Sequence, residues 1–264
     1  MKQTRIFVFV ILIFACTAPG AHALTQPNDT DLEEMSHHQQ GATSALLLGD
    51  HTLLDQGEFS ISGDVHLSSW TTDAIYGAWG LSIQGKPGER WGLGLSYGET
   101  DAQLHTHSWL ANGTYALVDG PEPWLHLQTA LGYQYLDSSD SGNVIFYEYG
   151  YEWPAAPDNP LILLDDIDWA HGYLNLHANT RLWVLRFSMS LGYMYSGYWW
   201  SGWDWRYDPG IGEVKGDSLS DSGHIDTFTW SLGLGLDLGP VRPFAGVGTF
   251  KDGGFFLARL TFVF

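Results

Sequence analysis

Cysteine is almost missing from this sequence: the single copy, Cys16, lies near the amino terminus. One cysteine cannot form a disulfide within its own chain, so the fold has no cross-links of that kind. The same scarcity excludes zinc sites built from several cysteines, and it removes cysteine nucleophiles from everything that follows position 16.

Basic residues are also scarce, with 11 Lys and Arg against 30 Asp and Glu. Two of the 11 belong to the signal peptide that we infer below, so the mature chain carries 9 − 30 = −21. A charge of that sign and size argues against nucleic acids or anionic surfaces as partners.

Long apolar runs are missing too. The apolar run near the amino terminus, residues 7–16, is too short for a membrane-spanning helix, which needs roughly 20 residues. Lys2 and Arg5 precede it and Ala21-His22-Ala23 follows it, which predicts a cleaved signal peptide over residues 1–23. A lipoprotein cleavage site at the end of the run is the alternative, but the bulky Phe14 fits it badly.

Residues 24–57 are mostly polar, with short apolar patches at 46–48 and 53–54. Two interpretations stay open for this segment. It is either a periplasmic N-terminal extension with one short helix or a mostly flexible tail.

Aromatic residues and glycine are plentiful, with 13 Trp, 13 Tyr, 13 Phe and 32 Gly, and from Phe59 onward the apolar residues alternate with small or polar ones. In 224–238, for example, one face carries Phe228, Trp230, Leu232, Leu234, Leu236 and Leu238. Strands of about 10 residues that are apolar outward and polar inward are what a barrel in lipid requires. Arg186, His126 and Gln128 have the inward parity.

Gly- and Pro-rich turns then divide the chain into strands. We expect short periplasmic turns at 85–89, 119–123, 179–181 and 239–242, and the opposite connections at 71–73, 99–102, 137–167, 197–223 and 251–253. The result is an all-β chain: a ten-stranded antiparallel transmembrane β-barrel over residues 58–264, with both termini in the periplasm. Its predicted strands are 58–70, 74–84, 90–98, 103–118, 123–136, 168–178, 182–196, 224–238, 242–250 and 254–264.

The last predicted strand alternates up to a terminal aromatic residue, Phe264. That ending resembles the C-terminal signal of outer-membrane barrels. It implies localisation in a Gram-negative outer membrane and the barrel-assembly machinery as a partner.

Three short motifs resemble the omptins, outer-membrane proteases that cut near basic residues. They are Asp101-Ala102-Gln103-Leu104, Leu131-Gly132-Tyr133-Gln134, and Tyr195-Ser196-Gly197 followed by Tyr207-Asp208-Pro209-Gly210. The resemblance covers most of the chain from residue 58 and implies ten strands with long third and fourth extracellular loops.

The omptin resemblance implies a site with an Asp-x-Asp in the second loop and an Asp-x-His in the fourth. Here Asp204 is kept, but Arg206 occupies the position of the histidine, and arginine cannot act as a base. The second loop is short, so only Glu99 and Asp101 remain as a candidate acidic pair, against the simpler interpretation of a solvated turn.

His105 and His107 share one face of the fourth predicted strand. They are candidates to supply an imidazole or to bind a divalent metal with nearby carboxylates, but two histidines do not complete a metal site. The simpler interpretation is that both are lumen-facing and hydrogen-bonded to neighbours.

The third and fourth loops combine acidic and aromatic residues, including Trp203, Trp205 and Asp208 beside Arg206. Such loops suit cationic peptides or proteins through charge and cation–π contacts. Surface carboxylates also suit Ca²⁺, and part of the aromatic run fits an outer girdle.

Two functional hypotheses follow. The first is a binding or structural barrel on an omptin-like scaffold, and the replacement by Arg206 favours it. The alternative is an endopeptidase with a rearranged site built on Asp204, Glu99 and Asp101. We expect no cofactor and no resident metal. The lipid partners we expect are those of the outer membrane, lipopolysaccharide included.

Overall fold

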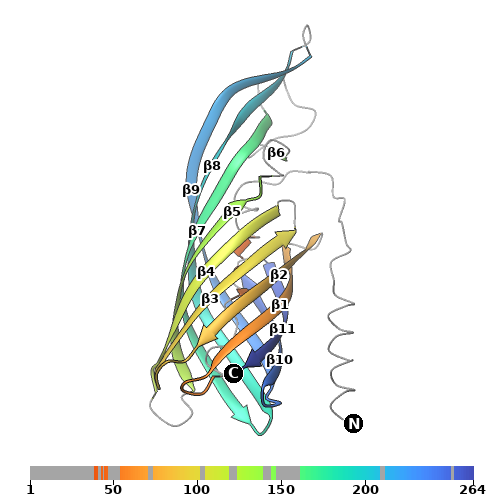
Figure 1. Cartoon of the computed structure of the whole chain (residues 1–264). Coiled ribbons are helices and arrows are strands. Elements are labelled where there is room, and N and C mark those ends of the chain that lie inside the picture. Colours follow the sequence, from red (N-terminus) through yellow and green to blue (C-terminus); the bar gives the residue numbers. More distant parts are fainter. Residues whose placement is uncertain are drawn as a thin grey trace, which may run out of the picture.

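Long antiparallel strands wind around a common axis in the computed structural model of the protein (Figure 1). The structure describes residues 39–40, 43, 45–46, 54–70, 74–101, 105–118, 124–138, 144–146, 161–208, 212–250 and 253–264. The strands are β1 (Phe59–Trp70), β2 (Ala74–Gly85), β3 (Trp91–Asp101), β4 (His105–Ala116), β5 (Leu125–Leu136), β6 (Val144–Phe146), β7 (Leu161–Leu182), β8 (Leu185–Asp208), β9 (Gly212–Leu236), β10 (Val241–Phe250) and β11 (Gly253–Val263).

Ten of these strands close into a barrel, which confirms the predicted fold and strand count. Each pairs with its sequence neighbour, β5 pairs with β7, and β1 pairs with β11 from Ser60↔Val263 to Trp70↔Gly253. The short β6 lies outside the ring and pairs only with β7. Closure leaves no free sheet edge in the wall, as the hydrocarbon of a membrane demands.

The two ends of the barrel chain meet at the seam between β1 and β11. Phe264 N donates to Phe59 O at 2.9 Å, and the two phenyl rings stack with centroids 5.0 Å apart. The terminal aromatic residue singled out in the sequence therefore completes the ring of strands.

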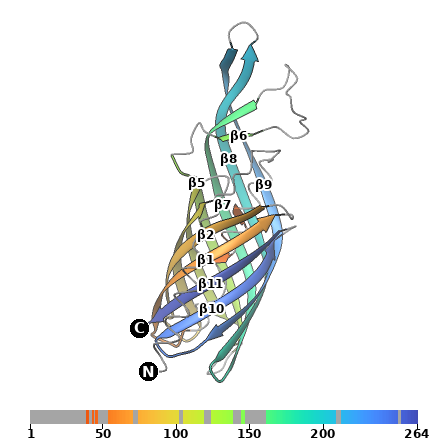
Figure 2. The ribbon, with the colours of Figure 1, turned by 90° about the vertical axis from the view of Figure 1, so that its right-hand side faces the viewer.

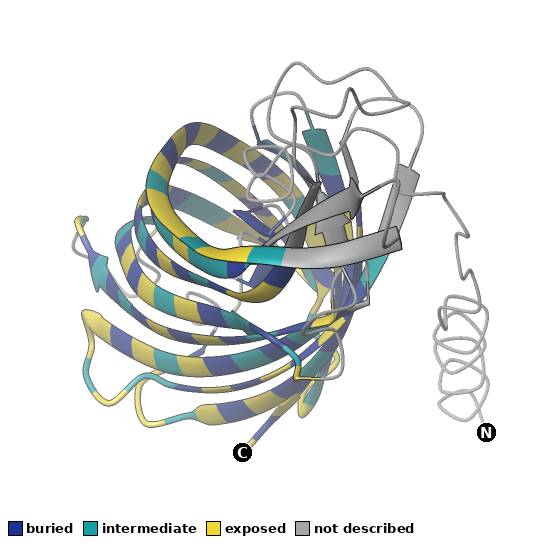
Figure 3. Ribbon diagram, turned by 90° about the horizontal axis from the view of Figure 1, so that it is seen from above, coloured by how far each residue is buried: buried dark blue, intermediate teal, exposed yellow. Residues whose placement is uncertain are grey.

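Side chains alternate strictly between the two faces of the wall, as the bands of buried and exposed residues in Figure 3 show. The outer face is apolar; Phe228 is 74% exposed and Leu131 is 75% exposed. Arg186, His126 and Gln128 are buried on the inner face, as predicted. An apolar face of this extent is stable in lipid and unfavourable in water, so the barrel spans a membrane. Within the described part of the chain, no helix is long and apolar enough to cross a membrane.

One predicted turn is misplaced by a few residues. We expected a turn at 179–181, but β7 continues to Leu182 and the chain reverses at Trp183 and Val184 before β8 starts at Leu185. Trp183 has φ 60, the positive value that the first central residue of a tight two-residue hairpin requires, and its side chain is 84% exposed. Because no Gly, Asn or Pro marks this turn, its position could not be read from turn residues.

Three strands rise far beyond the others, as Figures 1 and 2 show. β7, β8 and β9 have 22, 24 and 25 residues, whereas the other barrel strands have 10 to 12. Their projecting parts, 161–168, 197–208 and 212–226, form what we call the extension sheet. The prediction of loops over 161–167 and most of 197–223 is therefore wrong.

Five described residues of the segment 24–57 lie inside the barrel. Gln39, Gln40, Thr43, Ala45 and Leu46 are helical and at most 2% exposed. We had expected this segment to extend into the periplasm or to form a flexible tail. These residues instead occupy the lumen, where their polar side chains bond to the wall.

Candidate functional site

A cluster of polar side chains lies at the outer surface of β3, β4 and the end of β5. His107 Nε2 is 2.7 Å from Asp137 Oδ2, and its Nδ1 is 2.7 Å from the Tyr97 hydroxyl. That hydroxyl donates to Glu99 Oε1 at 2.6 Å, and His107 Nδ1 lies 3.5 Å from the same oxygen. The imidazole is thus held between the carboxylates of Glu99 and Asp137.

The interpretation of His105 and His107 as lumen-facing residues is wrong. In β4 they alternate with the buried Thr106 and Ser108, and His105 is exposed. Both share the outward face with Trp109, which is 46% exposed. The outer face of the barrel must be apolar only where it contacts membrane hydrocarbon. Nearer the end of the barrel a polar residue can face outward, so polarity alone does not assign it to the lumen.

Glu99, one member of the acidic pair proposed from the sequence, is not directed across the barrel mouth. Glu99 lies on the outward side of β3 and bonds to Tyr97. Asp101 ends that strand, and Asp204, Trp205, Arg206 and Asp208 lie in β8, but the side chains of these five residues are outside the described part of the structure. Trp203 is half-buried just before them. Among the described residues, no group of three His, Cys, Asp or Glu is placed to hold a metal ion.

The extension sheet begins where β7 and β9 lose their barrel partners. β5 pairs with β7 only up to Asp168, and β10 pairs with β9 only from Thr229 onward. Beyond these points the sheet is held by β7–β8 and β8–β9 pairing, with Asp168 opposite Trp199 and Trp199 opposite Ser222, and the short β6 pairs along the start of β7.

One side of the extension sheet carries an aromatic and aliphatic cluster that the sequence did not single out. Leu136, Leu164, Ile167 and Trp169 are buried together, and Tyr198, Trp200 and Leu219 pack against them. Much of the aromatic run assigned to a loop therefore serves to fix these strands.

The charge on the described side chains of the extension sheet is of one sign. The carboxylates belong to Asp165, Asp166, Asp168, Asp217, Asp221 and Asp226, and none of its described side chains is Lys or Arg. Burial, then the neighbouring carboxylate of Asp168, and less so that of Asp165, raise the pKa of Asp166 above its ordinary 3.8, against a backbone hydrogen bond at Ile167. A raised pKa means that the negative charge there lacks compensation.

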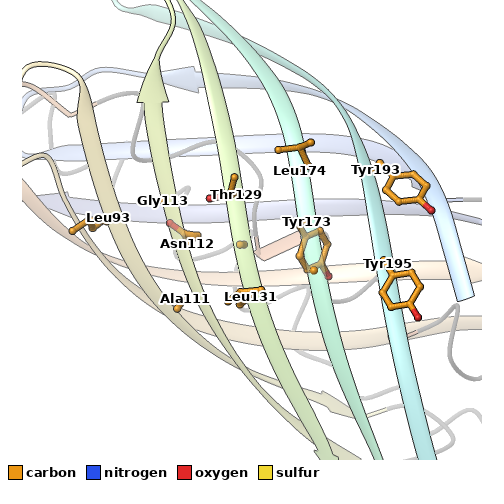
Figure 4. A pocket seen from close by; sticks show the side chains of 12 residues that line it. Leu93, Ala111, Asn112, Gly113, Thr129, Leu131, Tyr173, Leu174, Tyr193 and Tyr195 are labelled. Atoms are coloured by element: carbon orange, nitrogen blue, oxygen red, sulfur yellow. The ribbon is translucent and has the colours of Figure 1, made fainter. Parts of the chain in front are cut away.

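A shallow groove of about 620 Å³ crosses the outer surface of β3, β4, β5, β7 and β8 (Figure 4). Its floor consists of small residues such as Ala111, Gly113 and Gly172, and exposed Leu131 and Tyr195 border it. Since the groove opens on the apolar face, membrane lipid is the medium that fills it, and it offers no convergent polar groups for a soluble substrate.

At the opposite end of the barrel, Asp237 forms ion pairs with three arginines. Arg186 Nη2 lies 2.6 Å from its Oδ2, Arg181 Nη2 lies 3.2 Å from the same oxygen, and Arg242 Nε lies 3.4 Å from Oδ1. Burial raises the pKa of Asp237, but the hydrogen bond from Arg186 and the charges of Arg186 and Arg242, with a smaller contribution from the Gly239 N–H, lower it below its ordinary 3.8.

We therefore expect Asp237→Asn to destabilise the barrel at pH 6 by about 1.5–3 kcal/mol, the range for a hydrogen bond to a charged group. Because the folded pKa is depressed, the stabilisation is complete above the unfolded value near 3.8 and is lost as the pH falls through the lower folded value. Urea unfolding in detergent at a series of pH values should show that the free energies of unfolding of the unchanged protein and the variant converge only below pH 3.8. A gap that stays constant down to the lowest pH would contradict this assignment.

No protein-family model matches the sequence, and neither does any curated protein. Among solved structures, the translocator domain of autotransporter NalP from Neisseria meningitidis is similar over 88% of this chain and 97% of that one, with 11% identity and a TM-score of 0.47. The KdgM porin in complex with disordered oligogalacturonate is similar over 77% and 98%, with 10% identity and a TM-score of 0.38. The N-terminal β-barrel domain of Pseudomonas aeruginosa OprF is similar over 78% and 97%, with 11% identity and a TM-score of 0.32. At these values the similarity carries no argument about ligand or activity, and the omptin resemblance stays a prediction.

Proposed function

We propose that the protein is an outer-membrane barrel that binds cationic peptides or proteins on its extension sheet. The observation that carries the proposal is the set of aspartates on that sheet, among whose described side chains no lysine or arginine is found. Carboxylates that outnumber the basic residues of the extension sheet, Arg206 and Lys215, favour a positively charged partner, because the partner relieves their mutual repulsion.

The orientation follows from the lengths of the connections and strands. Barrels of this class have short periplasmic turns and longer extracellular elements. We therefore assign the Trp183–Val184 turn to the periplasmic side and the extension sheet to the outside.

The distribution of described charge along the barrel agrees with a binding surface at one end only. Most of the described basic residues lie at the turn end, whereas the extension sheet is acidic. The turn-end basic residues are Lys86, Arg90, Arg181, Arg186 and Arg242, and Asp237 and Glu58 pair with three of them. A cationic partner is thus attracted more strongly to the extension sheet than to the opposite end, where charges of both signs are paired.

The test is a double variant, Asp165→Asn with Asp166→Asn, in the refolded full chain. For a short peptide rich in arginine and lysine, we expect binding about three- to tenfold weaker than for the unchanged protein at low salt. That range corresponds to the loss of two exposed charge contacts. The difference should vanish near 1 M salt, where charges are screened beyond about 3 Å. Fluorescence anisotropy of a labelled peptide measures both.

The matched control is Asp55→Asn with Glu89→Gln, which removes the same charge from two exposed residues at the turn end. It should leave peptide affinity unchanged. If both double variants weaken binding equally, only the net charge matters and the extension sheet is not the binding surface. If neither does, the proposal fails.

The endopeptidase alternative is tested on the same samples by mass spectrometry of a peptide with a dibasic pair. The outward position of Glu99 gives that alternative no support, so we expect the peptide to stay intact. Cleavage that disappears in Asp204→Ala would establish a protease in place of a binding barrel.

A further inference from the structure

The helical residues in the lumen are hydrogen-bonded to one arc of the barrel wall. Gln39 Oε1 accepts from Thr106 Oγ1 of β4 at 3.1 Å and from Gln134 Nε2 of β5. Gln40 Nε2 donates to Ser196 Oγ of β8 at 2.9 Å. Gln39 and Gln40 therefore bond to the strands on either side of β7.

Leu46 is seated against a part of the wall shaped for it. It packs with Leu110, Ala130, Tyr173 and Met194. A Cβ on Gly80 would lie 2.5 Å from one of its methyl groups, and a Cβ on Gly98 would lie 3.1 Å from the other. Arg259 Nη2 of β11 donates to the Leu46 carbonyl at 3.2 Å. Ala45 faces the apolar residues of β10 and β11 instead, among them Phe244 and Leu257.

The inner face of β1 to β4 is polar. Its buried side chains include Ser60, Ser82, Gln84, Ser96 and Asn112. Hydroxyl and amide groups of this kind are hydrogen-bonded by water wherever water reaches them. The lumen without the helical residues is therefore a surface that water can wet.

The number of strands sets how wide the lumen would be without the helical residues. An eight-stranded barrel is just filled by its own side chains, but this ten-stranded one also encloses helical residues. Removing them exposes a lumen lined by hydroxyl and amide groups, with Arg186 and Arg242 toward the turn end.

We propose that Gln39, Gln40, Thr43, Ala45 and Leu46 belong to a removable plug, and that the unplugged barrel conducts monovalent ions and small uncharged polar solutes. The proposal requires only the membrane location of the barrel and not the binding of peptides by the extension sheet. The contacts that hold the plug are non-covalent, and the lumen around it is lined by polar groups that water can hydrate.

The test is one full-length chain with three substitutions, Gln40→Cys, Leu46→Asp and Ser196→Cys, and with Cys16→Ser to leave no other thiol. Aspartate at position 46 places a charge in the apolar seat and should release the plug. A disulfide-containing bis-maleimide linker between the thiols at positions 40 and 196 should retain it, and such a linker does not need the close Cα approach of a direct disulfide. In planar bilayers with KCl, we expect the cross-linked protein to stay closed and the same sample to conduct at least about tenfold more after reduction by dithiothreitol.

Comparing one sample before and after reduction controls for folding, because the chain is the same in both states. Equal conductance in the two states would mean that ions do not pass where the plug lies, and silence in both would mean that plug release opens no path; either result overturns the proposal. Peptide affinity, measured with the Asp165→Asn, Asp166→Asn variant described above, tests the extension sheet independently.

Discussion

Replacing Arg259 by methionine is expected to lower the free energy of unfolding of the barrel by about 3–5 kcal/mol, the cost of removing one partner of a buried ion pair. Arg259 is 1% exposed, and its Nη2 lies 3.2 Å from Asp64 Oδ2, itself fully buried. Without the guanidinium, the Asp64 carboxylate keeps only His66, whose Nδ1 lies 3.6 Å away. Equilibrium unfolding in urea, in detergent micelles or lipid vesicles, measures the change.

The double variant Asp64→Leu, Arg259→Met identifies the cause of that loss. Most of the cost of the single variant is an uncompensated buried charge, so removing both charges should restore most of the stability. If the double variant instead stays as unstable as the Arg259→Met variant, the ion pair itself stabilises the barrel, and if it loses the sum of the two single effects, the two side chains act independently. Leu46 loses its hydrogen bond from Arg259 in both proteins, so that contact does not affect the comparison.

The membrane-spanning part of the fold was predictable because lipid imposes a simple rule on it. Every outward residue must be apolar there, so the length of the alternating run that includes Leu232, Leu234 and Leu236, with small or polar residues opposite, indicated a strand with one lipid-facing side. The inward position of Arg186 followed from the same rule and the strand number from the turn residues, and the structure confirms both.

The extension sheet was not predictable in this way. Water contacts its surface, so outward residues there need not be apolar. Its strands carry Asp166 and Asp226 toward solvent and Ile167 toward the buried cluster, with a register shift between Leu164 and Asp166. Serine, glycine and aspartate in such stretches are typical of loops. Only pairing between the long strands, such as Trp199 with Ser222, reveals that they are strands.

The candidate site illustrates the same limit at single residues. His107 has the parity of Trp109, which already placed it on the outer face, but its polarity led us to assign it to the lumen. The lumen contacts of Gln39 and Gln40 had no sequence signal, since a plug needs only to fit the wall that the other strands build.

A charged side chain on the lipid-facing surface should destabilise the barrel more, the deeper it lies in the membrane. Leu232 pairs with Val247 near the middle of β10, so we expect Leu232→Arg to destabilise the barrel by about 2–4 kcal/mol, as for arginine near the bilayer midplane. Leu238 lies beyond the end of β9, where the same substitution should cost about 0–1 kcal/mol. Unfolding in lipid vesicles measures both.

These two leucines make a matched pair because their exposures are nearly equal, 46% for Leu232 and 42% for Leu238. If water surrounded the barrel, equally exposed positions would tolerate arginine equally well. A large cost at Leu232 with a small one at Leu238 therefore measures depth in hydrocarbon and not burial in protein. Equal costs would mean that this face does not lie in the membrane, and the orientation assigned to the extension sheet would lose its basis.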